Sequence, residues 1–364
     1  VSARTLEKPS LYLSRSDYMP VVEDGRWLPK QIEMNLMAAA LGTSNEKVYE
    51  LLRAVYGPTP TVEKMPLNNG GTGLAATLAE SYFRYAPKNG QILLIVPQGE
   101  VNAFDQRALQ SYITARHNIH VRRTSLEEIN EKLEMRGTKA YFENREVVIA
   151  YFRAGYSPTH YENASTWPAR KALEASDAIC VPNALTQLAN TKKMQQILKN
   201  KEILVNYVGP AEADALLETQ VILTPLDSTI TFRGQEGTAR ELALQDPSAW
   251  VLKPSREGGA NNYFGEDMVG HLKSLDAHQS EAYILMELIN QPTRTGIRLV
   301  EEKIVESPCV TELGHFTGCL WEPGNAEPIF NRTYGYLQRT KDEKNTEGLV
   351  LGGYSYLDAV TLID

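Results

Sequence analysis

The chain has 364 residues, a length that favours two packed domains, or one domain with a large insertion, over a single hydrophobic core. Its net charge of −8 at pH 7 argues against nucleic acid as the main partner, because phosphate contacts require a basic face. No apolar run approaches the roughly 20 residues of a membrane-spanning helix, so we expect no membrane partner.

Other function classes are disfavoured by missing motifs. The chain begins VSARTLEKPS, without Met or the apolar core of a signal peptide, which we interpret as a processed or truncated start. Cys180, Cys309 and Cys319 are too dispersed for a disulfide framework or a zinc site, so we expect packing roles and a cytoplasmic location. The absence of G-x-S-x-G, Walker A and GxGxxG motifs disfavours acyl-enzyme hydrolases, P-loop ATPases and nicotinamide dehydrogenases.

The first segment with a chemical pattern is KQIEMNLMAAALG, residues 30–42. Read as a strand, it places Ile32 and Met34 on one side and Glu33 and Asn35 on the other. An acid and an amide on one face suit half of a magnesium shell. An exposed sheet face has the same pattern, so this assignment depends on a second half-site elsewhere.

The middle third alternates between apolar strands and helices. The expected elements are strands over 91–98, 120–124 and 147–156, and helices over 102–116, from the Ser125–Glu128 capping box to about Met135, and over 169–175. This order is typical of a parallel α/β unit. Ligands bind beyond the carboxyl ends of such strands, which marks residues 98–102 and 153–156 as a candidate site.

The last third contains strand-like segments with few long helices between them: WVLKP (250–254), EAYILMELI (281–289), SPCVTELGHFTGCLW (307–321) and NRTYGYLQRTK (331–341). This pattern favours a mostly antiparallel sheet, separate from the α/β unit. We therefore expect an α/β protein, α+β overall. Residues 88–190 would form a substrate-binding α/β domain, and residues 1–87 with 191–364 the catalytic and lid portion.

The strongest chemical signal is WVLKPSREGGANNYFG, residues 250–265. A strand delivers Lys253, and the double glycine makes a flexible loop whose backbone N–H groups can approach phosphate oxygens. Glu257 and Asn262 supply oxygens of the kind that magnesium prefers. A hairpin loop rich in turn residues is the alternative, but it does not account for the whole string.

Charged residues alternate along two of the expected strands. Val310 and Glu312 share one strand face, and Arg339 and Lys341 share another. A surface salt-bridge ladder between strands has the same pattern, so both interpretations stay open.

Other residues stand at the edges of apolar segments. Arg15, Arg153 and Arg339 carry planar guanidinium groups that suit carboxylates and phosphoryl groups, although each could also be a surface arginine. The strand YILMELI is either core or the edge of an adenine pocket.

Taken together, these strings resemble the eukaryotic glutathione synthetases of the ATP-grasp superfamily. The matching strings occur in family order: SRSDYM, QIEMN, NAFDQRA, VIAYFRAGYSP, TQLANTKKMQQ, VLKPSREGGANN, YILME, TELGHF and LQRTK. The family has a helical segment before SRSDYM, so we expect the numbering to begin inside the protein. The resemblance implies an ATP-grasp fold with an inserted parallel α/β substrate-binding domain, mobile lid loops and a homodimer.

The resemblance also implies a site, in which Arg15 and Arg339 are the candidate catalytic residues. Two magnesium ions would be held by Glu33, Asn35 and Glu257. ATP would be bound by Lys192, Lys253, Glu257, Gly258, Gly259, Asn261, Asn262, Phe264, Met286, Glu287, Ile289, Glu312, Lys341 and Glu347. The γ-glutamyl dipeptide and the product end would be bound by Arg15, Ala38, Ala40, Asn102, Gln106, Arg153, Gly155, Tyr156, Arg339, Val350 and Leu351.

Some positions depart from the family pattern. Phe264 stands where the family often has Tyr, which removes a hydroxyl contact to nucleotide. Ala38 and Ala40 replace serines near the dipeptide and leave that contact to backbone or water. Leu351 stands where glycine-using members tend to have Ala, and the β-alanine-using branch also has leucine there. One methylene is worth only ~1–3 kcal/mol of discrimination in such a pocket, so the acceptor stays open.

The implied reaction needs no protein nucleophile. ATP phosphorylates the cysteine carboxylate of γ-glutamylcysteine, and the amine of glycine then displaces phosphate to give glutathione. The alternatives are a homoglutathione-type ligase that uses β-alanine, another ATP-grasp peptide ligase, a non-catalytic nucleotide-binding protein and a redox-sensing interaction protein. ADP release that depends on γ-glutamylcysteine separates these alternatives.

Overall fold

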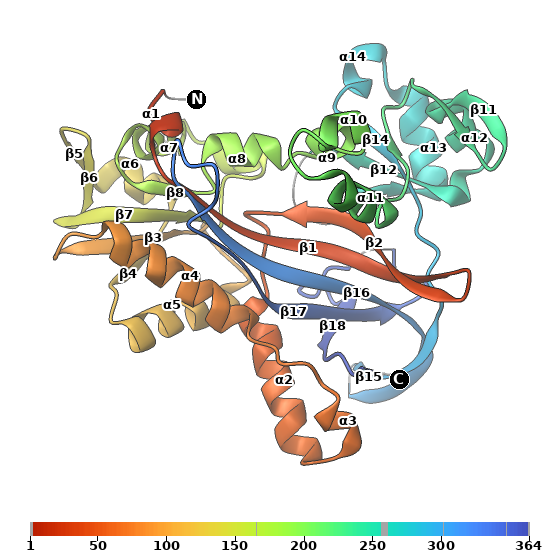
Figure 1. The fold of residues 1–364 in the computed structure, drawn as a ribbon, viewed down its shortest axis with the longest axis horizontal. Helices are drawn as coiled ribbons and strands as arrows, with labels where there is room; N and C mark the ends of the chain where they lie inside the picture. Colours follow the sequence, from red (N-terminus) through yellow and green to blue (C-terminus); the bar gives the residue numbers. More distant parts are fainter. Residues whose placement is uncertain (1–2, 165, 256–260, 301, 347, 363–364) are drawn as a thin grey trace.

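The computed structural model describes residues 3–164, 166–255, 261–300, 302–346 and 348–362. The described residues form four sheets: a central sheet, an α/β sheet on one side of it, and on the other side a small sheet with a separate two-stranded sheet (Figure 1). The expected mixed α/β architecture is confirmed. The position of the domain boundaries stays a prediction.

The central sheet is antiparallel, in the order β18-β17-β16-β1-β2. Strand β15 pairs with the N-terminal end of the long strand β16. Its strands are β1 Ser10–Glu23, β2 Arg26–Asn35, β15 Arg294–Val300, β16 Lys303–Trp321, β17 Phe330–Asp342 and β18 Ser355–Asp358. The antiparallel pairing expected for the last third is therefore confirmed. It also includes the first two strands of the chain.

The α/β sheet has the order β4-β3-β7-β6-β5, with β8 beside β7. Strands β3, β4, β7 and β8 are parallel, as expected. The elements are β3 Gly90–Ile95, α5 Ala103–His117, β4 Val121–Thr124, α6 Leu126–Lys132, β5 Leu133–Arg136, β6 Lys139–Phe142, β7 Arg145–Phe152, η1 Pro158–Tyr161, α7 Thr166–Ala175 and β8 Ile179–Val181.

One prediction in this unit is wrong in part. The helix after Ser125 ends at Lys132, and the chain then forms the β5–β6 hairpin around Gly137, whose φ of +63° suits glycine. The Ser125 side chain accepts the backbone N–H of Glu128, but the Glu128 carboxylate binds Thr124 at 2.8 Å. Only the Ser125 half of the expected capping box is therefore present.

The small sheet is antiparallel, in the order β13-β12-β14-β9, and carries its helices as a separate lobe (Figure 1). Its strands are β9 Leu223–Thr224, β12 Trp250–Pro254, β13 Tyr263–Phe264 and β14 Tyr283–Glu287. In the same lobe, β10 Thr229–Phe232 and β11 Gln235–Thr238 pair with each other as a separate two-stranded sheet. The helices of the lobe are α12 Ala239–Gln245, η2 Pro247–Ala249, α13 Gly265–Ser274 and α14 Ala277–Ser280. The chain reaches it through α8 Ala184–Ala189, α9 Lys192–Ile197, α10 Lys201–Leu204 and α11 Pro210–Glu218.

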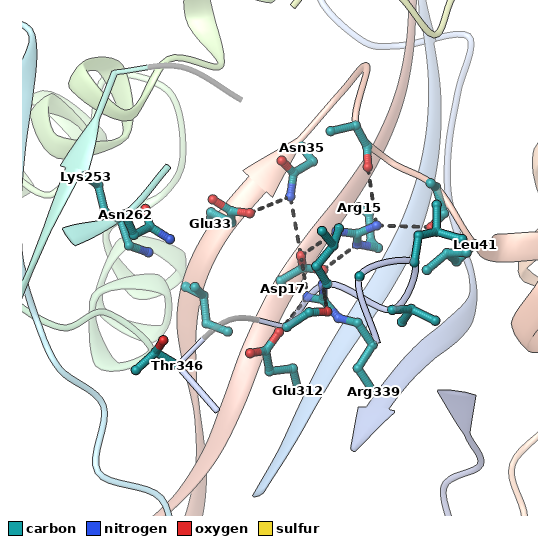
Figure 2. Close-up of a pocket in the computed structure, with 18 of the residues that line it drawn as sticks. Arg15, Asp17, Glu33, Asn35, Leu41, Lys253, Asn262, Glu312, Arg339 and Thr346 are labelled. Atoms are coloured by element: carbon teal, nitrogen blue, oxygen red, sulfur yellow. Dashed lines mark hydrogen bonds and ion pairs between the residues drawn. The ribbon is translucent and has the colours of Figure 1, made fainter. Parts of the chain in front are cut away.

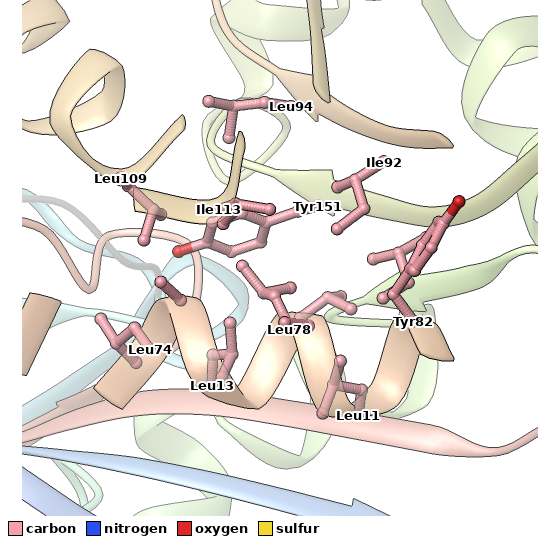
Figure 3. Packing of buried hydrophobic residues seen from close by; sticks show 14 of the residues in the cluster. Leu11, Leu13, Leu74, Leu78, Tyr82, Ile92, Leu94, Leu109, Ile113 and Tyr151 are labelled. Atoms are coloured by element: carbon pink, nitrogen blue, oxygen red, sulfur yellow. The ribbon is translucent and has the colours of Figure 1, made fainter. Parts of the chain in front are cut away.

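Helix α4, Gly70–Tyr85, lies between the central sheet and the α/β sheet (Figures 1 and 3). Its residue Leu78 packs in one cluster with Leu11 of β1 and Ile92 of β3. This core therefore contains side chains from both sides of the expected boundary at residue 87. The remaining N-terminal helices are α1 Ala3–Glu7, α2 Gly42–Tyr56 and α3 Pro60–Glu63.

The same face of the central sheet continues beyond α4. Along β1, Leu11 and Leu13 pack against the helix, and the alternation then directs Arg15 and Asp17 to the same side. The helix begins at Gly70, where an added Cβ would lie 3.0 Å from the Phe316 ring, so helix and strand are in close contact there. Beyond this point α4 no longer covers the sheet.

The strand predicted over residues 30–42 ends at Asn35, and α2 begins at Gly42. The β1–β2 register shifts between Asp17, opposite Glu33, and Tyr18, opposite Gln31, so Ile32 is an extra, bulged residue. The alternation predicted for this strand is therefore wrong at Ile32, and it holds for Glu33 and Asn35. Ile32 lines the same cavity as Glu33 and Asn35.

Candidate functional site

A cavity of about 450 Å³ lies where the uncovered part of the central sheet meets the small sheet and the edge of the α/β sheet. This volume lies within the range of small-molecule sites, about 300–1,000 Å³. Four groups of residues line it: the floor from the central sheet, one end from β12–β14, the other end from loops at 38–41, 100–102 and 153–156, and a wall from residues 346 and 348–352.

The floor is a chain of buried ion pairs (Figure 2). Asp17, 1% exposed, accepts Arg15 Nε at 2.6 Å and Nη2 at 2.7 Å, and Arg339 Nη2 at 3.2 Å. Glu312 pairs with Arg339 at 2.7 Å and with Lys341 at 2.9 Å. Two carboxylates therefore hold three cations together beneath the cavity.

The alternating charges of Glu312, Arg339 and Lys341 also fit a salt-bridge ladder on the protein surface. The register of β16 and β17 sets Glu312 opposite Arg339 and Val310 opposite Lys341, which agrees with the strand faces predicted for these residues. However, Glu312 and Lys341 are buried, which excludes a solvated surface ladder. Burying ion pairs costs desolvation energy and is weak evidence for stability, so this arrangement points to a binding role.

The pKa values of the floor follow from these contacts. Burial opposes the charged form of Glu312, but Arg339 and Lys341 outweigh it and keep the pKa of this carboxyl below its ordinary value. Burial also opposes the cation of Arg15, yet Asp17 raises its pKa. Glu312 and Arg15 are thus both charged at neutral pH.

The Glu33 carboxylate lies beside the floor, at the end nearer the small sheet (Figure 2). Asn35 Nδ2 donates to it at 3.0 Å, and Lys192 Nζ pairs with it at 3.1 Å. Burial alone would raise the pKa of Glu33, but Lys192 and Lys253 lower it to a value far below the ordinary one. This carboxylate therefore stays ionised at any pH where the protein works.

The small sheet supplies the apolar end of the cavity. Antiparallel pairing sets Val251 opposite Met286 and Lys253 opposite Ile284. The Glu287 backbone N–H donates to Ile222 O at 2.9 Å, and its side chain accepts the Ile222 N–H at 3.3 Å. Glu287 is therefore fixed through both its backbone and its carboxylate.

The opposite end is built from loops. Arg15 Nη1 donates to the carbonyls of Ala40 at 3.0 Å and Ala38 at 3.4 Å, and Arg153 Nη1 donates to the carbonyl of Met37. Leu41 has a φ of +73°, which is unusual for a residue other than glycine. Its N–H is held by Asp105 at 2.9 Å. Two arginines and one aspartate thus fix this loop at the edge of the cavity.

Comparisons with known proteins agree with this geometry. Residues 2–362 match the sequence family described as eukaryotic glutathione synthase, ATP binding domain. The chain is 37% identical to the glutathione synthetase of Bos taurus, over 96% of this chain and 74% of that protein. The chain belongs to the eukaryotic glutathione synthetase family. It is also 30% identical to the glutathione synthetase large chain of Schizosaccharomyces pombe, over 97% of this chain and 75% of the relative.

A solved structure shares the fold of this family member. The glutathione synthetase-like effector of Globodera pallida, in its apo form, is similar with a TM-score of 0.73 and 18% identity. The similarity covers 98% of this chain and 78% of that one. At this identity it supports the fold alone.

Most of the residues implied by the family resemblance come together in the cavity. Those that line it are Arg15, Glu33, Asn35, Ala38, Ala40, Asn102, Arg153, Tyr156, Lys253, Asn262, Phe264, Met286, Glu287, Ile289, Glu312, Arg339, Val350 and Leu351. Lys192 and Lys341 lie one contact behind, through Glu33 and Glu312. Glu257, Gly258, Gly259 and Glu347 lie outside the described residues, and Asn261 is described but is not part of the cavity lining.

Two expected dipeptide residues do not line the cavity. Gln106 is buried behind it, where its amide nitrogen donates to Glu100 at 2.6 Å and its oxygen accepts Arg123 at 2.9 Å. Gly155, with φ +101°, faces Tyr161, whose hydroxyl an added Cβ would meet at 2.5 Å. In this structure Glu100 lines the cavity in front of Gln106.

Sequence reasoning missed Asp17 and Glu100, the two other acidic residues of the cavity wall. Asp17 is present in the string SRSDYM, two positions from Arg15, so strand alternation could have placed both on one face. Glu100 follows Gly99 in a loop, where an acid is usually solvated, and no pattern marks it.

The side chains of Glu33 and Asn35 suit a magnesium ion, because they combine a carboxylate and an amide, the oxygen-bearing groups that this ion binds. The third expected ligand, Glu257, lies outside the described part of the chain. Within that part, no three His, Cys, Asp or Glu side chains form a ready-made metal cluster. None of its helices is both long and apolar enough to cross a membrane.

Proposed function

We propose that this chain is an ATP-dependent ligase of the ATP-grasp type, which joins γ-glutamylcysteine to glycine and releases ADP and phosphate. The supporting observation is the buried floor of the cavity. Arg15, Asp17, Glu312 and Arg339 form one ion-paired chain at the point where the small sheet faces the α/β sheet. A site of this kind suits a reaction in which negative charge moves between bound groups.

The two ends of the cavity suit two different ligands. The end at β12–β14 offers apolar Met286 and Val251 beside Lys253, which fits a nucleobase next to phosphates. The end at the loops offers Arg153 and Asn102 beside Glu100, which fits a zwitterionic dipeptide. The floor lies between them, so a transferred phosphoryl group would pass over Arg15 and Arg339.

The proposed reaction has two steps. A carboxylate oxygen of γ-glutamylcysteine attacks the γ-phosphorus of ATP, the bond to the bridging oxygen breaks, and ADP leaves. The neutral amine of glycine then attacks the acyl carbon, and the tetrahedral intermediate expels phosphate while the amine loses a proton to solvent. The reaction requires no protein nucleophile, so catalysis rests on positioning and charge. Arg15 and Arg339 hold the reacting oxygens in place.

Magnesium would be held by Glu33 and Asn35, together with Glu257. The ion would supply positive charge that offsets the charge on the transferring phosphoryl group. Lys192 already neutralises one oxygen of Glu33 at 3.1 Å. It would keep this carboxylate oriented toward the cavity.

β-Alanine is the second candidate for the acceptor. Leu351 is 51% exposed and lines the cavity next to Val350, so the wall at this end is apolar and partly open to solvent. The two acceptors differ by one methylene, and a leucine contact can favour the longer one by a factor on the order of ten.

A coupled assay of ADP release tests the proposal. The purified chain, ATP and magnesium are combined with γ-glutamylcysteine and either glycine or β-alanine, and the tripeptide is identified by mass spectrometry. We expect ADP and tripeptide in equal amounts, only when both the dipeptide and an acceptor are present. ADP release that is indifferent to γ-glutamylcysteine would contradict the proposal.

A further inference from the structure

We infer that Asp17 is a positioning residue, which holds Arg15 and Arg339 side by side as one pair for the reacting oxygens. This inference rests on the proposed function for its catalytic meaning. Its structural basis is independent, since it follows from the contacts of one buried carboxylate. None of the roles assigned above includes Asp17.

The geometry gives Asp17 a position that no other described carboxylate shares. Its Oδ2 atom accepts Arg15 Nη2 at 2.7 Å and Arg339 Nη2 at 3.2 Å, so the two guanidinium groups meet at one oxygen. Asn35 Nδ2 also lies 3.3 Å from this atom. Asp17 thus joins β1, β2 and β17 beneath the cavity.

The two arginines depend on Asp17 to different degrees. Arg339 has a second carboxylate partner, Glu312 at 2.7 Å, whereas the contacts described for Arg15 are Asp17 and two backbone carbonyls. Two guanidinium groups this close repel one another, and burial strengthens the repulsion. Without the charge of Asp17, Arg15 has no described carboxylate to hold it beside Arg339.

Gly314 on β16 provides the space for this arrangement. An added Cβ there would lie 2.6 Å from Asp17 Oδ1 and 2.8 Å from Arg15 Cδ. Its φ is not in the left-handed region, so glycine is not needed for backbone conformation. Gly314 lies directly opposite Asp17 in the β1–β16 register. The sheet is therefore built without a side chain at the point where the Arg15–Asp17 pair lies.

The first test separates a role of Asp17 in positioning the two arginines from a role in binding ATP. Asp17→Asn keeps the size of the side chain but removes its charge, and we expect kcat to fall by about 100-fold, the effect of a misplaced reacting group. The KM for ATP should change by less than about twofold, because Lys253 and Met286 lie at the other end of the cavity. An unchanged kcat, or a loss confined to KM for ATP, would overturn the inference.

A matched pair of glycine variants covers the case in which Asp17→Asn folds poorly. Gly314→Ala would displace Asp17 and Arg15, whereas Gly318→Ala, four residues along the same strand, would press on the Thr77 side chain of α4. We expect both to lower the unfolding midpoint, but only Gly314→Ala to lower kcat per folded molecule. Equal kcat values in the two variants would contradict the inference.

A stability cycle tests the pairing without any activity. Asp17→Asn should lower the urea midpoint less in an Arg339→Gln background than in the wild type. Without the Arg339 guanidinium, loss of the Asp17 charge no longer leaves two cations that repel one another. In an Arg153→Gln background, where the arginine bonds Met37, its effect should be unchanged. Equal effects in all three backgrounds would reject the role of Asp17. A wild-type chain without ligase activity would instead reject the proposed function.

Discussion

Two halves of one face of the central sheet differ in what covers them. In one half Leu11, Leu13 and Phe316 pack under helix α4, and in the other Arg15 and Asp17 lie under the cavity. The strands and their alternation are the same, and Asp17 is as buried as Leu13, 1% against 2% exposed. Where α4 no longer covers the sheet, ion pairs take the place of apolar packing.

This contrast separates stability from function. The apolar half stabilises the fold by burying hydrocarbon, at about 25 cal/mol per Å². The charged half is costly to bury and is maintained because each charge has partners. Variants in the two halves should therefore fail in different ways.

The largest effect is expected in the charged half. Arg339→Met removes the partner of both Asp17 and Glu312, so kcat/KM should fall by about 10³-fold. The free energy of unfolding should also fall by about 3–5 kcal/mol, because two buried carboxylates lose a cation. Steady-state ADP release and urea unfolding measure the two effects.

Arg332→Met is the matched control for Arg339→Met. Arg332 is on the same strand, but it pairs with Glu80 at the surface, where both side chains are nearly half exposed. We expect a loss of less than about 1 kcal/mol and normal turnover. A similar loss of turnover in both variants would remove the distinction between floor and surface.

The next effect lies in the apolar half. Leu13→Ala should lower the free energy of unfolding by about 2–5 kcal/mol, since it leaves a cavity beneath α4. Below the melting transition, KM and kcat per folded molecule should stay close to wild type. Calorimetry and ADP release check this, and lost turnover with unchanged stability would show that the two halves are not separable.

A smaller effect is expected at the edge of the floor. Glu33→Gln should raise the magnesium concentration for half-maximal ADP release by about ten- to a hundredfold, because one charged oxygen ligand is lost. The lowered pKa of Glu33 means that this carboxyl itself should add no pH dependence to the wild-type requirement between pH 5 and 8. A magnesium titration at several pH values measures both. An unchanged requirement in Glu33→Gln would remove this residue from the metal site.

The last prediction concerns a partly buried lysine outside both halves, with an effect on stability and none expected on turnover. Lys199 donates to the carbonyl of Val221, and burial, with the charge of Lys253, lowers its pKa to about 7. From pH 7 to about 10 the unfolded chain binds this proton and the folded chain does not, so stability rises with pH, by up to ~1.4 kcal/mol per unit. In Lys199→Met this rise should disappear from urea unfolding curves, and an identical slope would contradict the assignment.

Sequence patterns predicted the strands well where alternation or apolar runs were clear. The segment 250–254 is β12 as predicted, and the pairing of Glu312 with Arg339 follows from strand register. Alternation failed at Ile32, because a bulge depends on how two strands align rather than on either sequence. The helix predicted to reach Met135 ends at Lys132, because residues 133–136 pair in the β5–β6 hairpin, which the local sequence does not indicate.

The parts of the site that were missed depend on long-range contacts. Asp17 lies at the edge of an apolar segment, two residues from Arg15, and its importance comes from Arg339, which is 322 residues away in sequence. Gly314 has no conformational need for glycine, so only the three-dimensional crowding explains it. Local patterns carry no information of this kind.

The central claim is that an acyl phosphate forms over the floor of the cavity. The most direct measurement uses γ-glutamylcysteine whose cysteine carboxylate carries heavy oxygen, with ATP, magnesium and the acceptor. If the account is right, one labelled oxygen per turnover appears in the released phosphate, because the carboxylate attacks the γ-phosphorus. Tripeptide formation with unlabelled phosphate, or ADP release with the label retained in the dipeptide, would contradict it.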